Sequence, residues 1–377
     1  MKTHIEQVLK SMQWNECEFP WPTRRCEHWK YDAISGDLPL GQPAMSRAEA
    51  HLNAAVLCID GHISIAPAWQ DRITIAEDAC VLWPNEDKDA HQFLMDYGTH
   101  PGIRLTVRKH EKVEAPLVIK VVQRQQSMLP IHYRHAIQLE EGASLKMMVV
   151  FEGDAQQQWL HHHCALDIGP YATLQHYQVH QGASPSIHQA STQVSVAQSA
   201  QYIHRNYQLS AQLNRQTMAC RLQGDHASAD LQGMMLGKHD ETMSQIIKIW
   251  HHGEHSKSRQ VYRSLVADKA SSVWHSQVIA SPMVKDICSQ QDNKNLLVGD
   301  HAKAFTRPEL AIAAHQVKCA HGATIGQMDD RALLYLRSRG YTLEEAQNIV
   351  QKAFLEELLQ QWPEWAKAFI KTEFMNG

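Results

Sequence analysis

The feature that most constrains the fold of this chain is a long succession of short β-type runs between about residues 55 and 315. The runs are apolar or alternate apolar with polar residues, and they are rich in β-branched side chains, as strands are. Between the runs, short turns rich in Gly and Asp repeatedly end on an alanine. These alanines are Ala143, Ala172, Ala200, Ala227, Ala270 and Ala302.

The spacings between these alanines are 29, 28, 27, 43 and 32 residues, which give a loose period near 30. A repeat of this length indicates stacked rungs, because one rung cannot bury its own inner face and must be covered by its neighbours. A β-sandwich also contains many short strands and is the alternative architecture. Both interpretations predict a mainly β fold for this part of the chain.

Helical patterns lie on both sides of the β region. Near the start, apolar residues recur at helical spacing over residues 4–12, and residues 46–49 form a capping box. We therefore predict an N-terminal helical region over 1–58, a β core over 59–325 and a C-terminal helical region over 326–377.

The C-terminal region contains two helix signals. Asp329 or Asp330 can cap a helix that Gly340 ends, and Thr342 to Glu345 form a second capping box. An apolar stripe at helical spacing follows, which packs either on the chain's own core or on a partner protein. The stripe consists of Ala346, Ile349, Val350, Ala353, Phe354 and Leu358.

The composition excludes several classes of protein. A formal charge of −4 over 377 residues argues against a main role in binding nucleic acid or an anionic membrane. No run approaches 18 uninterrupted apolar residues, and the N-terminal segment lacks the features of a secretory signal. We therefore expect a cytoplasmic protein whose eight cysteines, which form no CxxC pair, are reduced.

Motifs for nucleotide binding and hydrolysis are missing from the sequence. The chain has no G-x-x-x-x-G-K-[ST] segment, and no G-x-G-x-x-G follows a strand, so we expect it to bind no nucleotide. It also lacks G-x-S-x-G and H-E-x-x-H sequences.

The 25 histidines include two clusters, one at His161 to His163 and one at His251, His252 and His255. On a strand His161 and His163 would share a face and could form a two-ligand metal site. Consecutive histidines in a polar strand are more often solvated, so we interpret both clusters as exposed surface.

Cys319 and His321 are a sharper signal. If this segment is extended, the two side chains face the same side, with Cα atoms roughly 7 Å apart. A thiolate and an imidazole on one face suit iron–sulfur or zinc ligation, although two ligands do not complete a site. The alternative is a buried core cysteine beside a chance histidine.

The segment from Asn295 to Gly340 resembles the SufB/SufD family of iron–sulfur cluster assembly proteins. It reads NLLVGDHAKAFTRPELAIAAHQVKCAHGATIGQMDDRALLYLRSRG, and its V-K-C-x-H-G-A-T form is more similar to SufD than to SufB. The PTRR segment at 22–25, the WKY segment at 29–31 and the RLQGDHA segment at 221–227 add to the resemblance. The resemblance implies a right-handed parallel β-helix between helical regions, in agreement with the stacked-rung prediction.

The resemblance also implies a function. It predicts a non-catalytic scaffold that pairs with a SufB-like paralogue and docks a SufC-like ATPase, which would hydrolyse the ATP. A transient iron–sulfur cluster would form at the interface with SufB, with Cys319 and His321 at the site. Cys288 stands where the family usually has no cysteine, so it is a secondary candidate only. The expected SufC contacts are Tyr335, Arg337, Arg339, Ile349, Ala353 and Phe354.

Some residues depart from the family pattern, and other functions stay open. Ala314, His315 and Gln316 stand where the family usually has A-D-D before V-K-C, so two carboxylates near the site are missing. The isolated chain could form a homodimer. A polysaccharide-acting enzyme on a β-helix and a His-rich metal-binding protein are the alternative functions.

Overall fold

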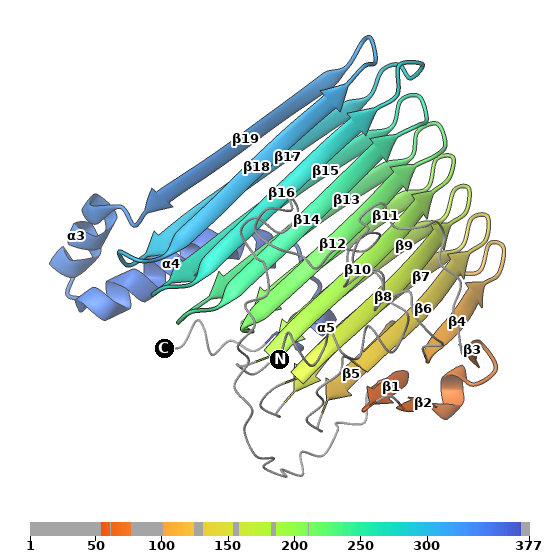
Figure 1. Cartoon of the computed structure of the whole chain (residues 1–377), viewed down its shortest axis with the longest axis horizontal. Helices are drawn as coiled ribbons and strands as arrows, with labels where there is room; N and C mark the ends of the chain where they lie inside the picture. The colour runs from red at the N-terminus through yellow and green to blue at the C-terminus, as the bar shows by residue number, and fades with distance from the viewer. Residues whose placement is uncertain are drawn as a thin grey trace, which may run out of the picture.

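The computed structural model of the chain describes residues 54–60, 62–76, 101–123, 131–153, 158–181, 186–209 and 211–370. Over these residues the chain winds between two facing β-sheets (Figure 1). Ten of the described strands form sheet A and nine form sheet B. From β4 onward each strand pairs in parallel with the strand two positions later, so the predicted parallel β-helix is confirmed.

The two sheets take alternate strands from the sequence. Sheet A contains β1 (Val56–Ile59), β2 (His62–Ile65), β5 (Leu117–Gln123), β7 (Ser144–Gly153), β9 (Thr173–Gln181), β11 (Gln201–Leu209), β13 (Ser228–Gly237), β15 (Lys257–Ala267), β17 (Cys288–Val298) and β19 (Lys318–Gln327). Sheet B contains β3 (Ile73–Ala76), β4 (Gly102–Val107), β6 (Ile131–Leu139), β8 (Gln158–Ile168), β10 (Ser186–Val196), β12 (Leu213–Leu222), β14 (Thr242–His251), β16 (Ser271–Ala280) and β18 (Lys303–Ile312).

Tight turns at one corner of the solenoid explain the repeat in the sequence. From β6 onward, each turn from sheet B to sheet A holds one residue at positive φ, and the next residue is directed toward the interior. The residues at positive φ are Gly142, Tyr171, Ser199, His226, His255, Asp286 and Gln316. The residues that follow them are Ala143, Ala172, Ala200, Ala227, Ser256, Ile287 and Val317.

The irregular step in the alanine series has a simple cause. Ala270 and Ala302 lie at the opposite corner, where the chain passes from sheet A to sheet B. The spacing of 43 residues is therefore the step from one corner to the other. At the first corner the series continues with Ser256, which occupies the alanine position and is fully buried.

The interior of the solenoid contains both apolar and polar side chains. In the early rungs, side chains such as Leu105, Ile119 and Leu145 fill the space between the sheets. In the later rungs hydrogen bonds cross that space, and Asn206 Nδ2 donates to Gln245 Oε1 at 3.0 Å. These cross-sheet bonds satisfy buried polar groups that would otherwise lower stability.

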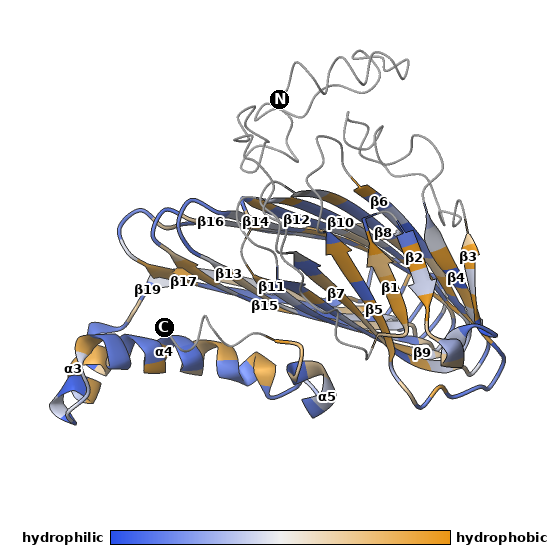
Figure 2. Ribbon diagram, turned by 90° about the horizontal axis from the view of Figure 1, so that it is seen from below, coloured by the Kyte–Doolittle hydropathy of each residue, from blue (hydrophilic) through white to orange (hydrophobic). Residues whose placement is uncertain are grey.

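Three described α-helices follow the last strand, α3 (Asp330–Ser338), α4 (Leu343–Leu359) and α5 (Glu364–Lys367). Asp329 caps α3, and both hydrogen bonds of the predicted Thr342 capping box are present at the start of α4. α4 and α5 lie along the outer face of sheet A (Figure 2). Leu355, Leu358 and Trp362 are buried there.

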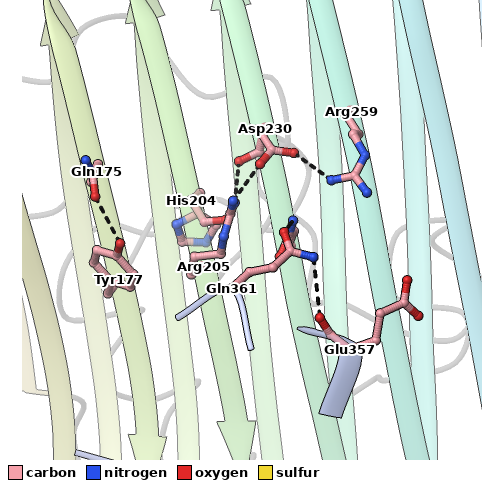
Figure 3. A network of polar contacts seen from close by, with 9 residues as sticks. Gln175, Tyr177, His204, Arg205, Asp230, Arg259, Glu357 and Gln361 are labelled. Carbon is pink, nitrogen blue, oxygen red and sulfur yellow. Dashed lines mark hydrogen bonds and ion pairs between the residues drawn. The ribbon is translucent and has the colours of Figure 1, made fainter. Parts of the chain in front are cut away.

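A polar network ties α4 to the same face of sheet A. Arg205 Nη2 donates to Asp230 Oδ2 at 2.6 Å (Figure 3). On the neighbouring strands Arg263, only 3% exposed, pairs with Asp292 at 2.9 Å and with Glu357 of α4 at 3.4 Å. Because the guanidinium of Arg263 is buried, it has lost its hydration, and its two carboxylate partners compensate that loss.

The helix predicted over 4–12 and the capping box at 46–49 lie outside the described residues. Within the described part of the chain, strands begin at Val56 and end at Gln327. No α-helix of that part has the length and hydropathy that a membrane span requires.

Candidate functional site

The C-terminal end of the solenoid is an uncovered rung. β19 lies at the margin of sheet A and β18 at the margin of sheet B, and no described strand pairs with their outer edges. Apart from the half-buried Cys319, the side chains of β19 are exposed, and those of β18 are mostly half-buried. An edge with unpaired backbone groups and an uncovered inner face is a surface to which another β-structure can add.

Cys319 ends an inward-facing row of side chains at this rung. The parallel register pairs Ser258 with Ser289, and Ser289 with Cys319. Cys319 is half-buried against an apolar corner that includes Val284 and Ile287.

The surroundings of Cys319 raise the pKa of its thiol. Burial is the largest cause, a hydrogen bond with the main chain of Ser289 acts in the opposite direction, and the nearby Cys288 raises the pKa further. The sulfur therefore carries its proton at neutral pH until a ligand displaces it.

His321 ends the next inward-facing row. The register places it beside Gln291, which in turn lies beside Gln260. Both glutamines are buried by the following rung, whereas His321 is exposed because no described rung covers it. β19 is extended at this point, so Cys319 and His321 face the same side, toward the open end of the solenoid.

Cys288 does not join this pair. It is the first residue of β17 and is exposed, and its register partners are Lys257 and Lys318. Lys318 precedes Cys319 in β19, so Cys288 faces the outer side of the sheet. Among the described residues, no three Cys, His, Asp or Glu side chains are grouped as a metal site.

The interpretation of the histidine clusters as exposed surface is wrong for most of their members. His161, His162 and His163 are all buried, and so is His251. Sheet strands in this fold can be covered on both faces, so a polar run does not indicate exposure. Only His252 and His255 are open to solvent as expected.

Sequence reasoning missed the row of serines that leads to Cys319. Ser258 and Ser289 are buried, polar and in register with the cysteine. Their spacing was the available signal, because Ser258, Ser289 and Cys319 follow one another at 31 and 30 residues, the period of the rungs.

The expected contacts for an ATPase fall into two groups. On α3, Tyr335, Arg337 and Arg339 are exposed, and the guanidinium of Arg339 lies 5.3 Å from the centre of the Tyr335 ring. On α4, Ala353 is exposed, Ile349 is half-buried, and the half-buried Phe354 packs against the chain's own sheet A. The stripe on α4 therefore packs at least partly on its own core.

Comparison with known proteins places this architecture in a family. The family model described as SUF system FeS cluster assembly, SufBD core domain, matches residues 121–354. The chain is 24% identical to the iron–sulfur cluster assembly protein SufD of Escherichia coli, over 95% of this chain and 87% of that protein. It is 28% identical to an iron–sulfur cluster assembly SufBD family protein of Synechocystis, over 52% of this chain and 43% of that protein. The chain with the uncovered end rung therefore belongs to the SufB/SufD family.

Proposed function

We propose that this chain is a non-catalytic scaffold subunit that takes part in iron–sulfur cluster assembly. Membership of the family and the names of the relatives support the general role. The observation that carries the specific proposal is the uncovered end rung, where Cys319 and His321 lie on the inner face of β19 and no described strand follows.

The partner at this end is a SufB-like paralogue. Iron–sulfur clusters are usually held by four protein ligands, and this rung offers one thiol and one imidazole. A second β-structure that pairs with the free edge of β19 would bring further ligands to the same face. The cluster is then a transient product shared by two chains. In the isolated protein a second copy of this chain can cover the same edge as a homodimer.

The second partner is a SufC-like ATPase that binds the C-terminal helices and supplies the nucleotide chemistry in the cytoplasm. Leu334 and Tyr335 on α3 are 68% and 58% exposed, and Arg337 and Arg339 stand beside them. Large exposed apolar side chains next to arginines are typical of protein interfaces. α3 begins at Asp330, directly after β19, so a movement of α3 would be transmitted to the end rung.

The test is to purify the chain together with its SufB-like and SufC-like partners and to measure iron, sulfide and visible absorption. We expect Cys319→Ala and His321→Ala to lower the cluster yield without dissociating the complex. Cys288→Ala is the matched control, because this exposed cysteine lies one rung away on the other face. An unchanged cluster yield in both Cys319→Ala and His321→Ala would refute the site, and failure of the wild-type chains to associate would refute the pairing.

A further inference from the structure

A group of polar side chains lies between the two sheets, one rung behind the uncovered end of the solenoid. Its members come from β15, β16 and β17, and each is at most 4% exposed. We call them the interior polar group, and they are Gln260, Tyr262, Trp274, Gln291, Asn293 and Asn295. The register places Gln291 beside His321 and Trp274 beside Thr306, so the last rung lies directly over the group.

Each of the four carboxamides in this group has one polar atom without a partner. The Ser276 hydroxyl, on the facing strand, donates to Gln260 Oε1 at 2.6 Å and accepts from Gln291 Nε2 at 2.8 Å. Asn295 Nδ2 donates to Asn293 Oδ1 at 2.7 Å. Within the described part of the chain, no hydrogen bond reaches the other atoms, Gln260 Nε2, Gln291 Oε1, Asn293 Nδ2 and Asn295 Oδ1. Turning an amide over exchanges its oxygen and nitrogen, so one atom of each stays unpartnered either way.

Two aromatic side chains of the group are in the same situation. Trp274 Nε1 and Tyr262 Oη have no hydrogen-bond partner among the described residues, although both side chains are fully buried and their ring centroids are 5.8 Å apart. An indole N–H only donates, whereas a phenol hydroxyl donates and accepts. The group therefore presents three unpartnered donors, two unpartnered acceptors and one unpartnered hydroxyl. A buried polar atom without a hydrogen bond lowers stability, and six of them together would offset much of the stability of a domain.

We propose that the interior polar group is a binding site for water, in which ordered water molecules bridge its six unpartnered atoms and join sheet A to sheet B behind the end rung. These atoms belong to neighbouring side chains, yet none of them is within hydrogen-bond geometry of another, so a bridging molecule is needed. Water satisfies both kinds of atom because it donates and accepts hydrogen bonds. A cation would be repelled by the N–H of Trp274, and an apolar guest would satisfy none of the six atoms. The proposal is independent of the role in cluster assembly.

The direct test is nuclear magnetic resonance of the isolated full-length chain with isotope-labelled tryptophan. We expect a rotating-frame Overhauser effect between water and the indole proton of Trp274, whose signal is identified with Trp274→Phe. Trp159 is the matched control, because it is 2% exposed and its indole already donates to Gln189 Oε1 at 3.1 Å. Its indole proton should show no such effect from water.

The second test uses the sign of a stability change, measured by urea denaturation. Removal of a dry, unpartnered hydroxyl stabilises a protein, whereas removal of a hydroxyl that binds water destabilises it. We therefore expect Tyr262→Phe to raise the ratio of unfolded to folded protein about fivefold, the factor that one ordinary hydrogen bond contributes. Tyr202→Phe should raise it similarly, because its hydroxyl is 3.0 Å from His176 Nδ1, and Tyr171→Phe, at a side chain that is 59% exposed, should leave it unchanged. A missing water contact at Trp274, or a Tyr262→Phe variant at least as stable as the wild type, would overturn the proposal.

Discussion

The buried histidines should make the folded state lose stability at pH values well above those at which most carboxylates titrate. Six imidazoles gather between the sheets in the first half of the solenoid, and several of their rings are in contact, with centroids 4.5 Å apart for the closest pair. They are His135, His162, His176, His180, His188 and His204. Burial lowers the pKa of each, and for His135, His176 and His188 it lowers the value to about 3.

The sign and size of the effect follow from proton linkage. In the unfolded chain these groups have an ordinary pKa near 6.5, so below that pH the unfolded state binds protons that the folded state excludes. The free energy of unfolding is therefore at its full value above about pH 6.5. It falls as the pH drops from there toward the folded-state pKa of these imidazoles. At pH 5.5 each group costs about 1.4 kcal/mol, so His135, His176 and His188 alone cost about 4 kcal/mol. That is a large share of the free energy of unfolding of a typical domain, which is roughly 5–15 kcal/mol.

Urea denaturation followed by circular dichroism at pH 7.5, 6.5 and 5.5 measures this loss. We expect the urea midpoint to fall steeply between pH 6.5 and pH 5.5. His176→Gln should reduce the slope of the unfolding free energy against pH by about one proton, or about 1.4 kcal/mol per pH unit. His239→Gln, at a side chain that is 75% exposed, is the control for the substitution itself. A stability that is flat between pH 7.5 and 5.5 would show that the interior histidines are hydrated or already protonated in the folded state.

Three further predictions concern the helices and the packing. Arg263→Ala should destabilise the protein by about 3 kcal/mol, because Asp292 loses its buried partner, whereas Glu357→Gln at an exposed carboxylate should change the melting temperature little. Leu334→Ala combined with Tyr335→Ala should weaken binding of the SufC-like ATPase, measured by titration calorimetry, while the melting temperature stays unchanged. Unaltered affinity would move the docking surface away from α3. Gly233→Ala should cost about 1–3 kcal/mol in chemical denaturation, because the added Cβ would meet the buried ring of Tyr262 at 2.2 Å.

The parts of the fold that depend on local chemistry could be predicted from the sequence. The caps at Asp329 and Thr342 need only a few adjacent residues, and both are present. The rung period was visible because a turn with one residue at positive φ favours a small residue after it, as at Ala172 and Ala200. Where Ser256, Ile287 and Val317 fill that position, the period continues but the composition hides it.

The interior could not be predicted in the same way, because hydropathy does not indicate which side chains are covered in a solenoid. His162 faces the space between the sheets and His161 faces the other side of the same strand, yet both are buried. The stripe on α4 shows a related limit, since apolar spacing alone does not distinguish Leu358 on its own sheet from a residue that binds a partner.

The candidate site depends on where the solenoid stops rather than on a local motif. Ser258 and Ser289, in the row of Cys319, are covered by the following rung, and so are Gln260 and Gln291 in the row of His321. At β19 the same two positions hold a thiol and an imidazole, and no described rung follows. Side chains that would be interior in any other rung are thus left uncovered within the described part of the chain. A two-residue ligand set is what one half of a shared site requires, and it explains why neither C-x-H spacing nor the cysteine count identified a complete site.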